Sequence, residues 1–481
     1  YSYDYKEDLV TGIVIPDSVT TITDYALSLF YNLESVELGS GLTYIPDGFC
    51  SQNEKLKVLT VSSENENYYS NNNAIFTKDK TKLVAVAPAC EEMIYLPAEC
   101  ENIDIIYTYI SEYSKVKIGY QEAGDLYVTE EGITYSKDKK TVIFCNTEKT
   151  GNVVLPNIVT GIGKNAFSGC EKITAITIPN SVTNISYGAF ADCTALKTVT
   201  MPSELKEIEG WAFAGCTSLS GVTLPNKLES IAEAAFLNTD LKGDLTIPNS
   251  VTYIGDSAFS YTQIENAQIG SGIESMIGAF KNIGSLKSVN LPSGVGEYYY
   301  AFSGCTNLTD VSLENGLEYI ANGAFSGCSS LKSISIPSTV SDICDSAFAY
   351  SGLESIVIPD NVVFLGEGAF SCCENLTDVD IGSGVKFIGI GVFAYSPVEN
   401  VDWGDNIEFI DSMTFAHANL ESVEIPNSVT AIMYAAFEGN EKLSNIKIPD
   451  SVEEIGAHAF DKTAWYMAQD KGNTYINNIL Y

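Results

Sequence analysis

The sequence predicts a repeat solenoid, in which short coils stack on one another and each adds a strand to one long parallel β-sheet. Three observations carry this prediction. A phenylalanine, in most units preceded by alanine, recurs every 21–23 residues, and each interval contains a motif of the form L-x-x-I-x-I-P. The chain is 481 residues long and 45% hydrophobic, which is too long for one ordinary core and rich enough to bury an interior. Since one coil cannot bury its apolar edge alone, each copy provides the surface on which the next copy packs.

The repeated phenylalanine keeps its register along most of the chain. Fourteen consecutive units have it, at Phe167, Phe190, Phe213, Phe236, Phe259, Phe280, Phe302, Phe325, Phe348, Phe370, Phe393, Phe415, Phe437 and Phe460. Leu27 and Phe49 occupy the same slot in two earlier units, and an eroded copy lies near residues 103–119. We expect these side chains to form a continuous buried column that fills the space between coils.

The strand of each unit is expected at its L-x-x-I-x-I-P motif, for example at residues 331–337. Alternation of apolar and polar residues over the second half of the motif is typical of a half-buried strand, and the proline ends the pairing because it cannot donate a hydrogen bond. A period of roughly 20–29 residues with this motif is the signature of a leucine-rich repeat. We therefore expect a solenoid of the leucine-rich-repeat type. Its parallel β-sheet should lie on the concave side, with turns and short irregular or helical segments on the convex side.

Two segments interrupt the repeat and are copies of each other. Residues 73–86 and 132–144 each consist of two short apolar-rich runs around Lys-Asp-Lys, which predicts an inserted β-hairpin. The run Tyr475–Tyr481 looks like the first strand of a third hairpin, and we expect the natural protein to continue beyond it. The expected organisation is N-terminal leucine-rich repeats over residues 1–61, a modified section with two hairpins around one degenerate repeat over 62–150, a regular leucine-rich-repeat array over 151–460, and a tail over 461–481 that starts the truncated hairpin.

The composition disfavours several classes of partner. With 26 Lys and Arg against 62 Asp and Glu, the net charge is −36, and both nucleic acid and anionic membranes require clustered positive charge instead. The sequence has no apolar run of about 18 residues, the length that a membrane-spanning helix needs, so we expect no membrane insertion. It opens at Tyr1 without a Met or a signal-peptide pattern, so an export signal is expected to lie outside the given chain.

Motifs of catalytic and nucleotide-binding sites are missing from the sequence. It contains no H-E-x-x-H, G-x-S-x-G, G-x-x-x-x-G-K-[ST] or G-x-G-x-x-G. The two histidines, His417 and His458, lie in different units at different phases of the repeat. We therefore expect no catalytic residues, no cofactor and no enzymatic activity.

Six cysteines share one slot, three residues after the phenylalanine. They are Cys170, Cys193, Cys216, Cys305, Cys328 and Cys373, whereas Thr239, Thr262, Ser351 and Asn440 occupy this slot in other units. A position that accepts Cys, Thr, Ser or Asn favours a small side chain that bonds nearby backbone in a tight turn. The alternative is a redox or metal ladder of stacked cysteines. We expect most of the twelve cysteines to be free and buried, with the adjacent Cys372 and Cys373 as the exception.

Three motifs define the units. They are an I-P-x-S-V-T-x-I start (residues 178–185, 247–254 and 425–432), an A-F-x-x-C centre (166–170 and 324–328) and the L-x-x-I-x-I-P close. Together they resemble the BspA-like leucine-rich-repeat proteins of bacterial surfaces, and the resemblance covers nearly the whole chain. It implies a secreted or surface-attached protein that acts in adhesion and binding, and it supplies no catalytic residue.

We expect an extracellular binding or adhesion module that recognises protein or glycan partners, without catalysis and as a monomer. One alternative is a rigid structural spacer that holds another domain away from the cell surface. Another is a hydrolase or inhibitor module that uses the inserted loops. A binding array should carry an irregular or aromatic patch, whereas a spacer should be uniform. The hairpins and the run Tyr298–Tyr300 favour binding.

The candidate binding residues lie in outward slots beside the middle isoleucine of the strand motif, which are small, polar and nearly free of aromatic side chains. Asp380, Asp402 and Glu424 occupy one such slot in three successive units, with Asp378 and Asn400 beside them. Neighbouring strands would set these carboxylates about 5 Å apart, and like charges opposite each other destabilise a sheet. A Ca²⁺ ion at Asp380 and Asp402 would offset this repulsion. The alternative is an exposed acidic row that solvent and salt screen.

Overall fold

A computed structural model gives the fold, and it describes residues 9–27, 30–46, 49–50, 52–90, 93–97, 100, 117–120, 127–469, 475–476 and 479–480. The eroded repeat expected near residues 103–119 lies outside this part of the chain, except for its last three residues. The chain forms two compact units. The smaller comprises Tyr1–Thr150 and Pro156–Lys172, and the larger comprises Gly151–Leu155 and Ile173–Tyr481.

The larger unit is a parallel β-solenoid, as the repeat predicts. Its longer strands are β12 (Gly151–Val154), β14 (Ile173–Thr177), β16 (Thr198–Thr200), β19 (Lys242–Thr246), β21 (Gln263–Gln268), β22 (Ser288–Leu291), β23 (Asp310–Leu313), β26 (Ser355–Ile358), β28 (Asp378–Ile381), β30 (Asn400–Asp402), β32 (Ser422–Glu424) and β34 (Asn445–Lys447). They pair in parallel in the sheets β12-β14-β16, β19-β21-β22-β23, β26-β28-β30 and β32-β34. We call the outward surface of these strands the main-sheet face.

The ladder of longer strands breaks where the sequence predicted it to continue. The motif at residues 331–337 forms no strand, although its apolar residues Leu331 and Ile336 are buried. The expectation of a strand there is wrong. The apolar side chains pack into the core as in the other units, but the backbone forms no regular hydrogen-bonded ladder with the neighbouring motifs.

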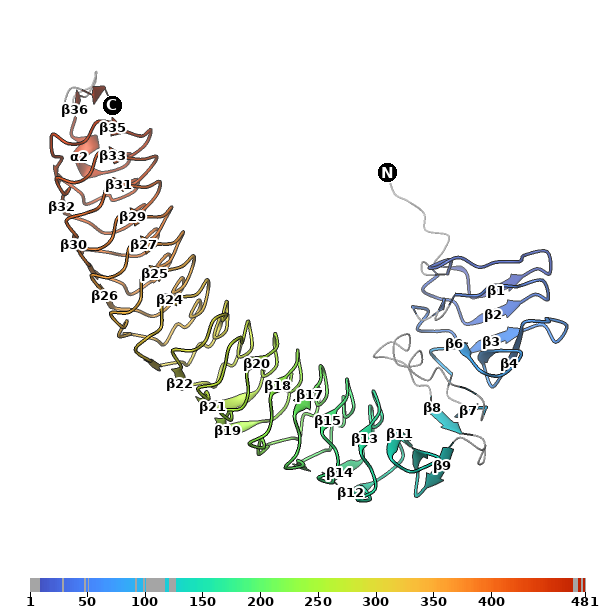
Figure 1. The fold of residues 1–481 in the computed structure, drawn as a ribbon. Coiled ribbons are helices and arrows are strands. Elements are labelled where there is room, and N and C mark those ends of the chain that lie inside the picture. The colour runs from blue at the N-terminus through green and yellow to red at the C-terminus, as the bar shows by residue number, and fades with distance from the viewer. Residues whose placement is uncertain are drawn as a thin grey trace. The chain divides into compact units, whose positions relative to one another are not determined.

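A second ladder of two-residue strands forms at the V-x-x-I segments, where turns and irregular segments were expected. Its strands are β15 (Asn184–Ile185), β17 (Glu207–Ile208), β18 (Ser230–Ile231), β20 (Tyr253–Ile254), β24 (Tyr319–Ile320), β25 (Asp342–Ile343), β27 (Phe364–Leu365), β29 (Phe387–Ile388), β31 (Phe409–Ile410), β33 (Ala431–Ile432) and β35 (Glu454–Ile455). Seven of them, from β24 to β35, form one continuous parallel sheet. Figure 1 shows the two rows of strands on different sides of the coils. The one α-helix within residues 127–469 is α2 (Ala464–Met467), which begins after the N-cap Thr463.

The repeated phenylalanines form a buried column, as expected. From Phe190 to Phe460 each ring stacks on the next, with centroids 5.1–5.7 Å apart and ring planes within 19°. Their exposure is at most 1%. Each ring therefore fills the gap that its neighbours would leave, and a coil is stable only against the next coil.

The slot three residues after the phenylalanine bonds backbone carbonyls, which confirms the interpretation of the cysteines. Cys216 Sγ donates to the carbonyl of Phe190 in the preceding coil at 3.0 Å, and Cys373 Sγ donates to Phe348 at 3.1 Å. Thr239 Oγ1 donates to Phe236 within its own coil at 2.9 Å. None of the twelve cysteines, all of which lie in the described part of the chain, forms a disulfide, and only Cys344 and Cys372 are not fully buried.

The smaller unit combines two sheet types. The parallel sheet of β1 (Gly12–Ile15), β2 (Ser35–Leu38) and β3 (Val58–Val61) continues the repeat pattern, and β7 (Met93–Leu96) pairs in parallel with β8 (Lys117–Tyr120). The antiparallel strands are β4 (Tyr68–Asn71), β5 (Ala74–Thr77), β6 (Leu83–Val86), β9 (Tyr127–Glu130), β10 (Ile133–Ser136) and β11 (Thr141–Cys145). A short strand, β13 (Gly161–Ile162), adds in parallel to β11.

The inserted hairpins are present, and each belongs to a three-stranded meander, β4-β5-β6 or β9-β10-β11. In the hairpin turns, the aspartate of Lys-Asp-Lys accepts hydrogen bonds from the strand ends, for example from Thr77 Oγ1 to Asp79 at 2.6 Å. This bond holds the pKa of the Asp79 carboxyl below its usual value. The first turn of each meander was not predicted. It has positive φ at Asn72 and Asn73, and at Glu131 and Gly132, as a type I′ turn requires.

The tail contains two short strands within the run that was expected to be one. Tyr475–Ile476 (β36) pairs antiparallel with Ile479–Leu480 (β37). The intervening Asn-Asn is the same pair of residues that joins β4 to β5, so the run matches the first two strands of a meander.

Candidate functional site

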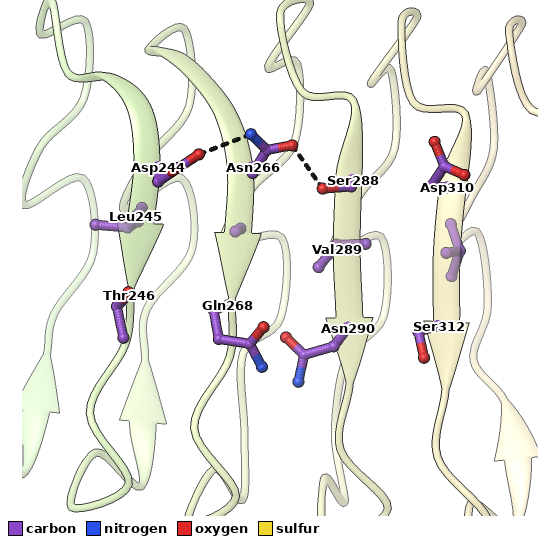
Figure 2. A pocket seen from close by; sticks show the side chains of 12 residues that line it. Asp244, Leu245, Thr246, Asn266, Gln268, Ser288, Val289, Asn290, Asp310 and Ser312 are labelled. Carbon is purple, nitrogen blue, oxygen red and sulfur yellow. Dashed lines mark hydrogen bonds between the residues drawn. The ribbon is translucent and has the colours of Figure 1, made fainter.

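A groove of about 610 Å³ lies on the main-sheet face of the larger unit, over β19, β21, β22 and β23. Its polar lining consists of Asp244 and Thr246 on β19, Asn266 and Gln268 on β21, Ser288 and Asn290 on β22, and Asp310 and Ser312 on β23. Figure 2 shows these side chains in two rows that run across the four strands. Leu245 and Val289 lie between these two rows, and Ala267 and Val311 complete the apolar lining.

The groove begins at an irregular strand. The motif of this unit, at residues 241–248, has one residue more than the others, and the pairing of β19 with β21 shifts between Gly243 and Asp244. Gly243 has φ +74°, a conformation that glycine adopts without steric penalty. An extra residue of this kind re-aims the side chains that follow it, and such irregularities are frequent beside functional sites.

Hydrogen bonds fix one row of the groove. Asn266 Nδ2 donates to Asp244 Oδ1 at 2.7 Å, and Ser288 Oγ donates to Asn266 Oδ1 at 2.6 Å, as drawn in Figure 2. In the other row Asn290 is bonded to the Ile269 backbone, accepting from its N–H at 2.6 Å and donating to its carbonyl at 3.0 Å. These side chains are therefore held in defined orientations before any ligand arrives.

The groove offers carboxylate, amide and hydroxyl groups and no basic side chain. Asp244, Gln268, Asp310 and Ser312 are exposed. Such a surface can hydrogen-bond a ligand rich in hydroxyl or amide groups, and its two carboxylates favour a neutral or cationic ligand over an anionic one. Asp244, Asn266 and Gln268 were not among the residues predicted from the sequence. The extra residue at 241–248 was the signal that could have found this region.

The predicted acidic residues also lie on the main-sheet face. Asp378 is opposite Asn400, and Asp380 is opposite Asp402, in the pairing of β28 with β30. Asn400 Nδ2 donates to Asp378 at 2.8 Å, and Thr377 Oγ1 donates at 2.6 Å. These two bonds, the one from Thr377 foremost, lower the pKa of the Asp378 carboxyl.

Glu424 stands apart from the other acidic residues. Its strand, β32, pairs with β34 in a separate sheet, where Glu424 lies opposite Lys447 and forms an ion pair with it at 2.9 Å. Across the described parts of the chain, no group of three or more Cys, His, Asp or Glu side chains has the arrangement of a metal site. The structure thus brings Asp380 and Asp402 together without Glu424, and Ca²⁺ binding there stays a prediction.

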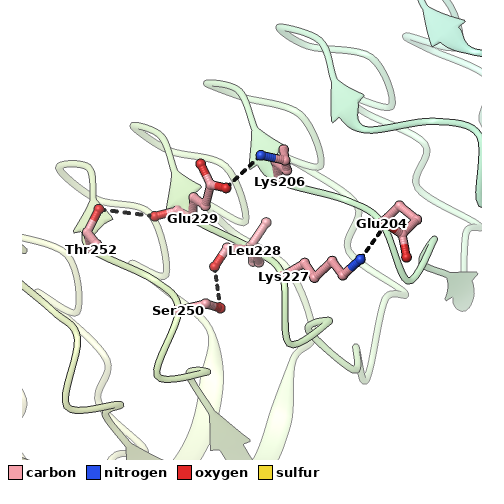
Figure 3. Close-up of polar contacts among 7 residues, drawn as sticks. All are labelled: Glu204, Lys206, Lys227, Leu228, Glu229, Ser250 and Thr252. Carbon is pink, nitrogen blue, oxygen red and sulfur yellow. Dashed lines mark hydrogen bonds and ion pairs between the residues drawn. The ribbon is translucent and has the colours of Figure 1, made fainter.

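Other polar side chains link neighbouring coils on the surface. Lys206 pairs with Glu229 at 2.9 Å, and Lys227 pairs with Glu204 at 2.6 Å (Figure 3). The bond to Glu229 raises the pKa of Lys206. Because these pairs are exposed, they contribute little to stability. They link neighbouring coils and do not form a functional site. The histidines also lie apart, with His417 stacked on Tyr395 and His458 bonded to Asp461.

Comparison with known proteins agrees with the repeat fold of the chain. The chain matches the BspA type Leucine rich repeat region in six copies, over residues 1–84, 140–263, 243–351, 298–421 and 408–466. No curated protein matches it. None of the described helical segments has the length and hydrophobicity to cross a bilayer.

Three solved structures are similar to this chain. A leucine-rich repeat protein from Bacteroides ovatus is 28% identical, covering 72% of this chain and 93% of its own, with a TM-score of 0.55. A leucine-rich cell surface protein from Faecalibacterium prausnitzii is 22% identical, covering 71% and 93%, with a TM-score of 0.32. The leucine-rich repeat protein of T. pallidum is 28% identical, covering 44% and 90%, with a TM-score of 0.30.

Proposed function

Since the chain belongs to the BspA-type leucine-rich-repeat family, we propose that it is an extracellular binding or adhesion module that recognises a protein or glycan partner without catalysis. The observation that carries the proposal is the groove over β19, β21, β22 and β23. The repeat is irregular at the first strand of the groove, where the pairing of β19 with β21 shifts, and polar side chains of three neighbouring strands are ordered there by one another.

The chemistry of the groove suits an extended, uncharged or basic ligand. Asp244, Asn266 and Ser288 form a hydrogen-bonded chain across three strands, so a ligand meets a fixed set of donors and acceptors. Little side-chain entropy is lost on binding, because these groups are already ordered. The hydroxyl groups of a sugar chain and the amides of an extended peptide both match such a row.

Buried cysteine thiols outside any disulfide are compatible with a location outside the cell. Burial raises the pKa of the Cys305 thiol and of the Cys50 thiol to about 12. A thiol reacts with oxidants as the thiolate, so buried thiols with raised pKa values resist oxidation. We propose secretion or attachment to a bacterial surface, which the family membership supports.

The proposal is tested with a panel of immobilised matrix proteins and glycans, probed with the full chain. The double variant Gln268→Ala, Asp310→Ala removes two exposed groups of the groove, and we expect it to lose about tenfold or more in affinity for the partner, equivalent to about 1.4 kcal/mol. Thr198→Ala, Thr200→Ala changes the same outward slots on β16, outside the groove, and should bind like the native chain. Equal binding by both variants would contradict the role of the groove.

A rigid spacer is the second candidate function, and the unbroken phenylalanine column favours it. Stacked rings from Phe190 to Phe460 resist bending because every coil is packed on both sides. A spacer predicts that the native chain binds nothing on the panel, and that deleting two coils shortens the molecule without changing the activity of a domain fused to it.

A further inference from the structure

Three phenylalanines occupy the outward slot of consecutive two-residue strands. Phe364 on β27, Phe387 on β29 and Phe409 on β31 lie opposite one another in register. The Phe387 and Phe409 rings are 5.9 Å apart, centroid to centroid, and tilted by 56°. We call these three residues the phenylalanine ladder. They are separate from the buried phenylalanine column, since they point away from the core.

Two rings of the ladder are exposed, and the third, Phe409, is half-buried. Phe364 is 38% and Phe387 is 39% accessible, and the neighbouring Val363 and Ile390 are 39% and 45% accessible. At both ends of the ladder the same slot carries an acidic or small residue, Asp342 before Phe364 and Ala431 after Phe409. The core does not need aromatic rings in this slot, and contiguous exposed apolar side chains of this kind mark interaction surfaces.

Acidic side chains surround the ladder. Asp342 lies opposite Phe364 in the pairing of β25 with β27, Glu367 is exposed three residues after Phe364, and Glu408 is exposed beside Phe409. In the sequence from Ser341 to Glu424, Lys386 is the one lysine or arginine. Throughout residues 127–469, no ion pair neutralises any of these three carboxylates. The patch is therefore apolar at its centre, and its rim carries these three carboxylates against the single exposed cation Lys386 beside Phe387.

We propose that the phenylalanine ladder is a docking surface for a basic, apolar segment of a partner protein. Lys or Arg side chains of that segment lie over the faces of Phe364 and Phe387, where the ring quadrupole attracts a cation, and also meet the carboxylates of the rim. Its apolar residues cover Val363 and Ile390. The occupant follows from the charge, because a second copy of this chain, with net charge −36, would bring like charges together, and nucleic acids and anionic lipids are repelled. This surface is formed by other strands than the groove, so the inference goes beyond the proposed function and does not rest on it.

The test uses the full chain and two synthetic peptides. One is an amphipathic 14-residue peptide of Lys and Leu, and the other carries Glu in place of each Lys. Calorimetry at about 0.15 M NaCl limits non-specific attraction to the acidic surface, because the Debye length is then about 8 Å. We expect the Lys peptide to bind and the Glu peptide not to bind. Phe364→Ser, Phe387→Ser should weaken the binding of the Lys peptide about tenfold or more.

Tyr253→Ser is the matched control. Tyr253 is an exposed aromatic residue in the same outward slot of β20, outside the phenylalanine ladder. The residues paired with it on the neighbouring coils are Ser230 and Ser275, so it forms no aromatic patch, and its removal should leave peptide affinity unchanged. Lys386→Glu should strengthen binding, and Glu367→Gln, Glu408→Gln should weaken it. Circular dichroism shows that each variant is folded.

Three results would overturn the inference. The first is equal affinity of the native chain and the Phe364→Ser, Phe387→Ser variant for the Lys peptide. The second is equal binding of the Lys and Glu peptides, which would make the patch merely apolar. The third is self-association of the native chain in analytical ultracentrifugation that the double serine variant abolishes, which would make the ladder an interface between two copies.

Discussion

Phe325 stacks between Phe302 and Phe348 in the middle of the buried column, at 5.6 Å from each ring. Phe325→Ala is expected to lower the free energy of unfolding by about 3–5 kcal/mol, because the removed ring leaves a cavity that rigid coils on both sides cannot close. Urea titration followed by circular dichroism measures this loss. Tyr299→Ala is the control. Because Tyr299 is 36% exposed, its loss should lower the free energy of unfolding by about 1 kcal/mol or less. Equal losses would show that the column is not the core.

The buried thiols provide a second prediction, on reactivity and on pH. Burial raises the pKa of Cys305 to about 12 and that of Cys373 to about 11, from an ordinary value near 9. In the native protein at pH 8.5, iodoacetamide should label the partly exposed Cys372 well before Cys305, as mass spectrometry of the digested protein would show. Labelling of all twelve cysteines at one rate would indicate that the coils open together.

The same thiols are expected to lower the free energy of unfolding at alkaline pH. Below about pH 9 a thiol is protonated in both states, so its contribution to stability is fully present. Between about pH 9 and 12 the unfolded chain ionises while Cys305 in the folded chain does not, so rising pH favours the unfolded state. Melting temperatures should therefore be flat near neutral pH and decline above about pH 9.

At the residue scale the repeat spacing was enough to place the phenylalanine column and the polar slot behind it. It was not enough for the run Tyr298–Tyr300. Tyr298 is fully buried and stacks on Tyr319 with centroids 5.6 Å apart, whereas Tyr299 and Tyr300 are exposed. Three identical residues in a row carry no periodicity, so only the position within the coil decides which one points inward.

Among the elements, the pairing of β28 with β30 carries the predicted acidic pair. Asp402→Asn is expected to stabilise the protein by a few tenths of a kcal/mol at low salt, because Asp380 no longer faces a like charge, and the gain should shrink as salt screens the pair. Thermal melts at about 0.01 M and 0.5 M NaCl measure the difference.

Calcium gives that pair a separate test. If the ion binds at Asp380 and Asp402, calorimetry at millimolar Ca²⁺ shows heat and the melting temperature rises, and both effects vanish in Asp402→Asn. Asp360→Asn, on an exposed carboxylate that accepts a hydrogen bond from the Ser383 backbone, is the control. Absence of heat in the native chain would leave Asp380 and Asp402 as a screened acidic row.

Two strands and one break in the sheet were not predicted from the sequence. The Lys-Asp-Lys turns predicted the hairpins. The strands β4 and β9 were missed because the Asn-Asn turn that joins β4 to β5 and the Glu-Gly turn that joins β9 to β10 were not interpreted as turns. The break between β30 and β32 was also missed. In β30 the last apolar slot of the motif is filled by Trp403, whose ring meets Phe415 edge-on at 5.3 Å, and the strand ends at Asp402. Strands β16 and β32 also end at this position, before Met201 and Ile425, so the residue type in the slot does not predict where the pairing stops.

At the scale of the whole molecule, the period alone predicted a leucine-rich-repeat solenoid, because a repeat that cannot bury its core alone must stack. The division of the chain at residues 61, 150 and 460 stays a prediction. A fragment that begins at Gly151 should keep the circular dichroism spectrum of the larger unit and lose part of the binding, if the meanders contribute to recognition. Full binding by this fragment would mean that the meanders have no part in it.

The groove was beyond prediction for a physical reason. Its residues are ordinary polar side chains in outward slots, and the one irregular feature beside them is the shift between Gly243 and Asp244 in the pairing of β19 with β21. A sequence shows the extra residue but not the direction in which it turns the side chains.

Hydrogen exchange of the full chain, with and without the partner that the binding panel selects, tests the proposed role of this groove most directly. We expect the amides of β19, β21, β22 and β23 to gain protection on binding, with the gain abolished in Gln268→Ala, Asp310→Ala and retained in Thr198→Ala, Thr200→Ala. Protection that falls on other strands while these four remain unchanged would contradict the proposal that the main-sheet groove binds the partner.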